Sequence, residues 1–174
     1  MVFRQKAITN HGIYQKNSMR EKKQISYVDD RFIKPIDRSK SPCVIVDIDG
    51  TCALRTGRSP FDYDKCDTDE WDERMARLLN LFIKQKIHII FVTGREETCR
   101  EKTDAWLQQY VSHYTLIMRK QGDHRKDTIY KEEVYHAQIE NDFDVVAVFE
   151  DRDQTTKMWR DLGLLTCQVY YGNF

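Results

Sequence analysis

The chain of 174 residues contains no run of about 18 apolar residues, so no segment of it is expected to span a membrane. Its first residues also lack the apolar core of a secretory signal. The five cysteines are odd in number and show no Cys-x-x-Cys spacing, which favours reduced thiols in a cytosol. Neither an internal repeat nor a Gly-x-x-x-x-Gly-Lys-Ser/Thr loop occurs, so the chain carries no P-loop kinase. We therefore expect a soluble, cytoplasmic protein with one domain of ordinary size.

The formal net charge is zero, but the charges are unevenly spread. Residues 1–41 hold ten Lys and Arg against four Asp and Glu, a net charge of +6, so the remainder carries −6. We expect a basic amino-terminal arm or leader over residues 1–41 and a folded domain over residues 42–174. Such an arm either contacts nucleic acid or is simply solvated, and the sequence leaves both readings open.

Strand and helix patterns alternate after residue 41. Between the predicted strands, apolar residues recur at helical spacing, and the three tryptophans fall on these stripes, which favours core packing for them. The alternation predicts an α/β fold with a mostly parallel, Rossmann-like sheet and helices on both faces. The strands are predicted over residues 43–47, 87–93, 115–118, 145–149 and 166–170.

Some individual residues are also expected in the core. Ile129, Tyr135 and Ile139 form one of the helical stripes. Cys43 and Cys167 lie in strand patterns and are expected to be small core residues.

The most informative segment is Val-Ile-Val-Asp-Ile-Asp-Gly-Thr, residues 44–51. A buried strand ends here, and its alternation points Asp47 and Asp49 to the same side. Two carboxylates this close repel each other unless a cation or a proton lies between them. Mg²⁺ is the natural occupant, because it prefers oxygen ligands and often combines carboxylates with a phosphate.

Polar residues also follow two other predicted strands. Thr93, Gly94 and Arg95 offer a hydroxyl, a backbone N–H and a guanidinium before a helix, an arrangement that suits phosphate. Glu150 and Asp151 form a second acidic pair that could complete a metal site. Because ligands bind beyond the carboxyl ends of parallel strands, we expect these groups to converge. The cations of residues 122–127 could hold phosphate oxygens near them, whereas His124 is expected to be solvated or a capping residue.

These residues resemble the motifs of the haloacid-dehalogenase-like phosphohydrolases. The first motif, a strand followed by Asp-x-Asp-Gly-Thr, matches Asp47 to Thr51, and the second matches Thr93. Lys126 and Lys131 compete for the third motif, a lysine upstream of the last acidic strand. The fourth, an acidic pair, matches Glu150-Asp151, where relatives often have Asp-Asp.

A closer resemblance, over about residues 42–174, is to the 3′-phosphatase domain of the T-even phage polynucleotide kinase/phosphatase. It implies removal of 3′-phosphates from DNA or RNA ends, a phage or viral origin with function in the host cytoplasm, and possible separate kinase and ligase partners, since no kinase half is present. The segments that carry it are residues 57–62, 93–97, 122–127, 131–133, 150–154, 158–159 and 172–174.

The resemblance also implies catalytic roles. Asp47 would be the nucleophile that forms an aspartyl-phosphate. The Asp49 side chain would protonate the leaving oxygen and then deprotonate the attacking water. Asp47, the Asp49 carbonyl and Asp151 would hold Mg²⁺, and Glu150 is a further possible ligand.

The remaining implied roles concern the phosphate. Thr93, the Gly94 N–H and the third-motif lysine would hold its oxygens. Arg58 and Arg95 would clamp the phosphate or the neighbouring backbone, and Asp127 would orient one of these two cations.

The segment between the first two motifs leaves residues 52–68 for a cap, too few for a large one. An open site can accept a polymer end, which agrees with a nucleic-acid substrate. The main alternative is a phosphatase of the same fold that acts on nucleotides or other small molecules. A receiver-type signalling module and a catalytically silent binding domain are more distant alternatives.

Overall fold

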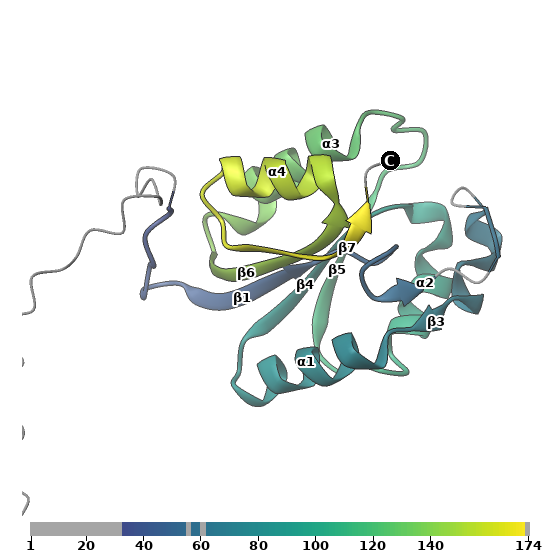
Figure 1. Ribbon diagram of the computed structural model, residues 1–174, viewed down its shortest axis with the longest axis horizontal. Coiled ribbons are helices and arrows are strands. Elements are labelled where there is room, and N and C mark those ends of the chain that lie inside the picture. The colour runs from purple at the N-terminus through teal and green to yellow at the C-terminus, as the bar shows by residue number, and fades with distance from the viewer. Residues whose placement is uncertain (1–32, 55–56, 60–61, 173–174) are drawn as a thin grey trace, which may run out of the picture. The chain divides into compact units, whose positions relative to one another are not determined.

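The computed structural model describes residues 33–54, 57–59 and 62–172. The expectation of a basic arm falls mainly on residues 1–32, outside the described residues. Five parallel strands form one sheet in the order β5-β4-β1-β6-β7 (Figure 1). The strands are β1 (Ser41–Val46), β4 (His88–Glu96), β5 (Tyr114–Arg119), β6 (Phe143–Arg152) and β7 (Thr166–Gly172). The α-helices are α1 (Glu73–Lys84), α2 (Arg100–Leu107), α3 (Asp127–Val134) and α4 (Asp153–Asp161), with a π-helical turn at Tyr135–Ile139.

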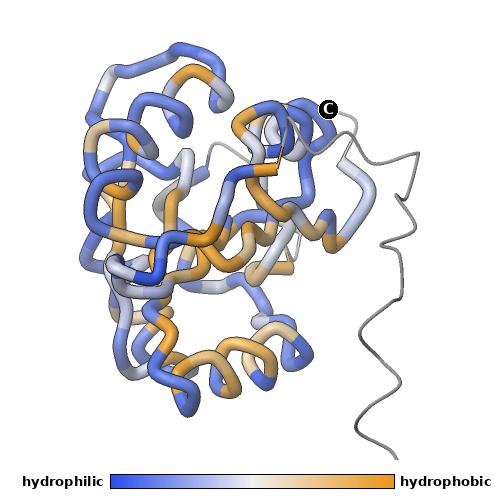
Figure 2. Tube along the Cα trace, turned by 90° about the vertical axis from the view of Figure 1, so that its left-hand side faces the viewer, coloured by the Kyte–Doolittle hydropathy of each residue, from blue (hydrophilic) through white to orange (hydrophobic). Residues whose placement is uncertain are grey.

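Alternation along the central strand divides the interior into two cores. Val44 and Val46 of β1 face a core that includes residues of α1 and α2, whereas Cys43 and Ile45 face one that includes residues of α3 and α4. Figure 1 shows α3 and α4 on one side of the sheet and α1 on the other. Hydrophobic segments accordingly gather along the central strands in Figure 2. The predicted α/β fold with helices on both faces is confirmed.

Helix α1 shows how local signals fix an element. The Asp72 carboxylate caps its start by accepting a hydrogen bond from the Arg74 N–H at 2.8 Å. Met75 and Leu79, one turn apart, are buried against the sheet. Each buried side chain of this size contributes roughly 1.5–3 kcal/mol of stability.

Several core predictions are confirmed and two are wrong. Cys43 and the three tryptophans are buried. Cys167 is exposed because β7 is the edge strand and pairs only with β6. Ile129 is also exposed, because the first turns of α3 direct it outward while Tyr130 and Val134 face the sheet.

The insertion between β1 and α1 is small. It comprises β2 (Ala53–Leu54), a 3₁₀ segment (Tyr63–Thr68) and β3 (Glu70–Trp71), which pairs antiparallel with β2. The prediction that no large cap covers the sheet edge is confirmed. Within the described ranges, no helix has the length and apolar character that a membrane crossing would need.

Candidate active site

A cavity of about 1010 Å³ opens at the carboxyl edge of the sheet, where β1, β4 and β6 end. It is far larger than a phosphate group needs. The side chains and backbone that line it are those of Asp47, Asp49, Gly94, Arg95, Glu96, Arg119, Asp123, His124, Arg125, Lys126, Asp127, Lys131, Glu150, Asp151, Arg152 and Gln154. The topology therefore brings the predicted polar strand ends together.

Three buried carboxylates form the first of two clusters in this site, the Asp47 cluster. Asp47 follows β1, and Glu150 and Asp151 lie at the end of β6. One oxygen from each of the three lies within 4.8 Å of the others. Gly50, at a φ of +84°, allows this approach, since a Cβ there would lie 2.1 Å from Asp151 Oδ2.

One lysine serves the Asp47 cluster. Lys131 Nζ donates to Asp47 Oδ1 and to Glu150 Oε2, both at 2.7 Å. Lys126 and Lys131 were both candidates for the lysine of the third motif. Lys131 of α3 is the buried one beside Asp47, whereas Lys126 is exposed and lines the cavity. Three carboxylates face a single ammonium group, so the cluster has excess negative charge.

Burial and the crowded charges together shift the pKa values of these groups. Burial, reinforced by Glu150, raises the pKa of Asp47 to about 7, although Lys131 opposes the shift. Burial and the neighbouring Asp47 raise the pKa of Asp151 to about 6. Burial lowers the pKa of Lys131, but the Asp47 and Glu150 carboxylates outweigh it and the net shift is upward.

The Asp47 cluster fits a divalent cation. Its donors are carboxylate oxygens, which hard cations such as Mg²⁺ prefer, and they lie close enough to share one ion. A cation would also offset the mutual repulsion of the carboxylates, which adds to burial in raising their pKa values. A buried acidic cluster of this kind is typical of metal-dependent sites.

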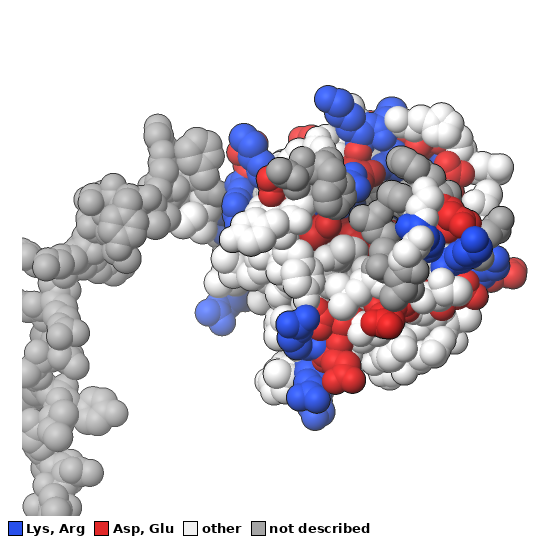
Figure 3. Space-filling model, turned by 45° about the vertical axis from the view of Figure 1, so that its right-hand side comes forward, with Lys and Arg blue, Asp and Glu red and all other residues white. Residues whose placement is uncertain are grey.

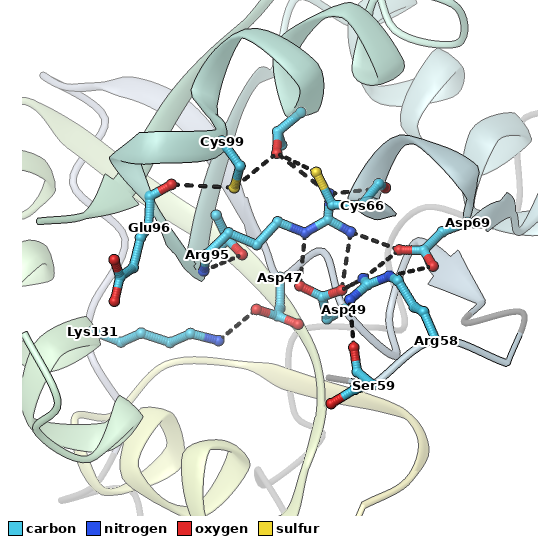
Figure 4. A network of polar contacts seen from close by, with 12 residues as sticks. Asp47, Asp49, Arg58, Ser59, Cys66, Asp69, Arg95, Glu96, Cys99 and Lys131 are labelled. Atoms are coloured by element: carbon cyan, nitrogen blue, oxygen red, sulfur yellow. Dashed lines mark hydrogen bonds and ion pairs between the residues drawn. The ribbon is translucent and has the colours of Figure 1, made fainter. Parts of the chain in front are cut away.

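The second cluster, the Asp49 cluster, is electrically balanced (Figure 4). Asp49 accepts hydrogen bonds from Arg95 Nε at 2.8 Å and from Arg58 Nη2 at 2.7 Å. Asp69, which is fully buried, bonds both guanidiniums as well. Burial raises the pKa of the Asp49 carboxyl, but the bonds to Arg95 and Arg58 outweigh it and hold that pKa below its usual value.

The second predicted motif lies near the end of a strand that leads into a helix. Strand β4 continues to Glu96, so Thr93, Gly94 and Arg95 are themselves strand residues, and a 3₁₀ turn (Glu97–Cys99) and α2 follow directly, as expected. The buried Thr93 hydroxyl accepts a hydrogen bond from the Arg95 N–H at 3.2 Å. Gly94 lines the cavity, and a Cβ there would lie 2.9 Å from Asp127 Oδ1.

The resemblance predicted that Asp127 orients Arg58 or Arg95. This prediction is wrong. The Asp127 carboxylate bonds Arg119 of β5 and, at 2.6 Å, Nη1 of Arg152. The reason is its position at the first turn of α3, which faces the ends of β5 and β6. Asp127 thus holds two cations at the far wall of the cavity.

Sequence reasoning missed Asp69 and gave no role to Arg119 or Arg152. Asp69 lies just before β3 in no recognisable motif, so nothing local signals its burial between two arginines. Arg119 did carry a signal, since it ends a predicted strand at the edge where ligands bind.

Residues 41–174 match the family described as the polynucleotide kinase PNKP phosphatase domain. The match starts at the first residue of β1 and includes every residue of both clusters. The chain belongs to this family. The expected haloacid-dehalogenase-like phosphatase of the polynucleotide kinase/phosphatase type is therefore confirmed.

A viral protein is among the relatives of this PNKP-type domain. The chain is 31% identical over 140 residues to a protein of Autographa californica nuclear polyhedrosis virus described as a bifunctional polynucleotide kinase/RNA ligase. The aligned part is 78% of this chain and 20% of that protein. The chain thus spans about a fifth of its relative.

Solved structures also include relatives of this domain. Two structures described as Pnkp1/Rnl/Hen1 complexes contain chains 35% identical to this one, with TM-scores of 0.79 and 0.77. They cover 82% and 88% of this chain, which spans 46% and 52% of theirs. A class C acid phosphatase from Bacillus anthracis is 14% identical to this chain, with a TM-score of 0.50, and shares the fold alone. The match covers 77% of this chain and 69% of the phosphatase chain.

Proposed function

We propose that the chain is a Mg²⁺-dependent polynucleotide 3′-phosphatase that repairs DNA or RNA ends. The observation that carries the proposal is the placement of Asp47 and Asp49. One lies in an under-neutralised, metal-type cluster, and the other lies 2.7–2.9 Å from two guanidiniums at the same cavity. Family membership supports the reaction class.

Asp47 attacks phosphorus and forms an aspartyl-phosphate, while the bond from phosphorus to the 3′ oxygen breaks. Asp47, the Asp49 carbonyl and Asp151 would hold Mg²⁺, with Glu150 available as a further ligand, and the bound ion supplies charge neutralisation. Lys131 Nζ, at 2.7 Å from Asp47 Oδ1, is placed to contact a phosphate oxygen as negative charge builds.

The Asp49 carboxyl gives a proton to the departing 3′ oxygen, and its carboxylate then takes a proton from the water that hydrolyses the intermediate. Arg58 and Arg95 hold the pKa of Asp49 down, so they favour the second role and oppose the first. Arg95 also lines the cavity, so it could contact the terminal phosphate, whereas Arg58 is not among the lining residues and bonds Asp49. Thr93 and the Gly94 N–H complete the proposed phosphate contacts.

A polynucleotide substrate is supported by the open architecture. The insertion before α1 is too small to form a large cap, and the cavity exceeds the volume of one phosphate. The relatives point the same way, since their descriptions name RNA repair, a polynucleotide kinase and an RNA ligase. We infer that RNA ends are the preferred substrate and that separate kinase and ligase activities complete the repair, in the host cytoplasm if the chain is of viral origin.

Phosphate release from a 3′-phosphorylated oligonucleotide tests the proposal. It would be measured with Mg²⁺ and with EDTA, for the wild type and Asp47→Asn, beside a 5′-phosphorylated strand and a mononucleotide. We expect metal-dependent release from the 3′ end alone, lost in Asp47→Asn. Faster hydrolysis of the mononucleotide would indicate a small-molecule phosphatase instead, and no release from any substrate would refute catalysis.

A further inference from the structure

Strand β7 departs from regular pairing where it passes the Asp47 cluster. Its register runs from Glu150↔Gln168 to Arg152↔Gly172, so three residues of β7 lie opposite Asp151 alone. At Gly172 the two strands are so close that a Cβ would lie 2.7 Å from the Asp151 carbonyl oxygen. Bulges of this kind redirect side chains and are common beside active sites.

Contacts hold the chain on both sides of Tyr171, the last residue of the bulge. On one side, the Tyr170 hydroxyl, within the bulge, donates to the Asp72 carboxylate and accepts from Arg74 Nη2 at 2.7 Å. The Arg74 guanidinium also lies 5.9 Å from the centre of the Tyr170 ring. On the other side, Gly172 returns to the β-ladder beside Arg152.

Tyr171 lies between these two anchors and is completely exposed, with a relative accessibility of 102%. Among the Phe, Tyr and Trp side chains whose burial the structure describes, none is as exposed; Tyr110 and Tyr170 follow at 39% and 37%. Its α-carbon is one residue, about 3.8 Å, from that of Gly172, which pairs with the cavity-lining Arg152. An aromatic ring is thus presented to solvent one residue before the position on β7 that pairs with a cavity-lining residue.

We propose that Tyr171 is a stacking platform for an unpaired nucleobase upstream of the terminal 3′ nucleotide. This inference rests on the proposed function and narrows its substrate to a single-stranded end. Every base has a π-face, so stacking on an aromatic ring binds a strand without reading its sequence. Figure 3 shows acidic and basic side chains interspersed over the visible face among the described residues, without a continuous basic track. A stacking contact would supply affinity that such a surface does not.

Binding and turnover test the inference separately. Binding uses single-stranded hexanucleotides, RNA and DNA, that end in a 3′-hydroxyl and so are not consumed, with 2-aminopurine at an internal position. Stacking quenches this fluorophore. The variants are Tyr171→Ala, Tyr171→Leu and Tyr171→Phe, with Leu165→Ala as the control, since Leu165 is an exposed apolar residue just before the opposite end of β7.

We expect Tyr171→Ala and Tyr171→Leu to weaken binding about tenfold and to lose the quenching. Tyr171→Phe and Leu165→Ala should bind like the wild type. For turnover, Tyr171→Ala should raise KM for a 3′-phosphorylated hexanucleotide and leave the kinetics with a 3′-phosphorylated mononucleoside unchanged.

Unchanged binding by Tyr171→Ala, or equal weakening by Tyr171→Phe, would overturn the stacking role. Absence of turnover by the wild type would refute the proposed phosphatase instead, and the binding result would still decide the role of Tyr171.

Discussion

The two acidic clusters share one edge of the sheet but differ in charge balance. The Asp47 cluster places three carboxylates around the single ammonium of Lys131, and the pKa values of Asp47 and Asp151 rise. The Asp49 cluster joins two carboxylates to two guanidiniums, and the pKa of Asp49 falls. Incomplete compensation of charge suits the binding of a cation, whereas full compensation fixes the Asp49 carboxylate in position.

The largest effect should come from removing the proton donor of the balanced cluster. Asp49→Asn keeps the shape but cannot give up or take a proton in the same way, so turnover of a 3′-phosphorylated oligonucleotide should fall roughly 10²–10⁴-fold. Turnover of p-nitrophenyl phosphate should fall much less, because its leaving group needs no proton. Steady-state kinetics on both substrates checks this, and an equal loss on the two would contradict the role in proton transfer.

Breaking the charge balance itself should cost stability. Arg95 is fully buried and bonds both Asp49 and Asp69, so Arg95→Ala leaves two carboxylates with one fewer partner. We expect a loss of about 3–5 kcal/mol in the free energy of unfolding, measured by urea denaturation.

Arg74→Ala is the matched control, because its guanidinium is largely exposed and its partner, the buried Asp72 carboxylate, keeps the hydrogen bonds from the Tyr170 hydroxyl and the backbone N–H of residue 74. It should change the free energy of unfolding by less than about 1 kcal/mol. A similar loss for both arginines would show that burial of Arg95 carries no special weight.

Sequence alone predicted that polar residues at several strand ends meet. Asp47, Gly94, Arg95 and the Glu150-Asp151 pair all line the cavity, because parallel strands end at one edge of the sheet, whereas Thr93 is buried and is not among the lining residues. Asp69 could not be predicted, since its burial depends on how a short insertion folds back onto Arg95. The partners of Asp127 were misjudged for the same reason: pairing between segments far apart in the chain depends on tertiary packing.

The pH dependence of stability should be opposite for the two clusters. Without metal, Asp47 and Asp151 have folded pKa values of about 7 and about 6, above the ordinary value of 3.8. The folded state therefore binds more protons, and stability should rise on the order of 4 kcal/mol as pH falls from about 8 to about 5. Asp49 loses its contribution only at lower pH, where its carboxylate protonates.

Urea denaturation in EDTA at several pH values measures this trend. Asp151→Asn should flatten it, because the substitution removes one of the carboxyl groups whose pKa is raised. If the stability of the wild type instead falls as the pH is lowered from about 8 to about 5, the assignment of excess negative charge to the Asp47 cluster is contradicted.

A smaller effect is expected at Gly94. Gly94→Ala would bring a Cβ to 2.9 Å from Asp127 Oδ1, so the Asp127 carboxylate must shift from its arginine partners. We expect a several-fold loss of turnover and a stability change of about 1 kcal/mol. A double-mutant cycle with Asp127→Ala checks the cause, since Gly94→Ala should have no further effect once the carboxylate is gone.

The contrast between the clusters is tested most directly by calorimetric titration with Mg²⁺ at pH 8. Wild type and Asp49→Asn should each bind one ion per chain, since the Asp49 carbonyl survives that change. Asp151→Asn should bind at least about tenfold more weakly, because it removes a charged ligand of the Asp47 cluster. Equal affinity in Asp151→Asn, or no binding by the wild type at millimolar Mg²⁺, would contradict the assignment of a metal site to this cluster.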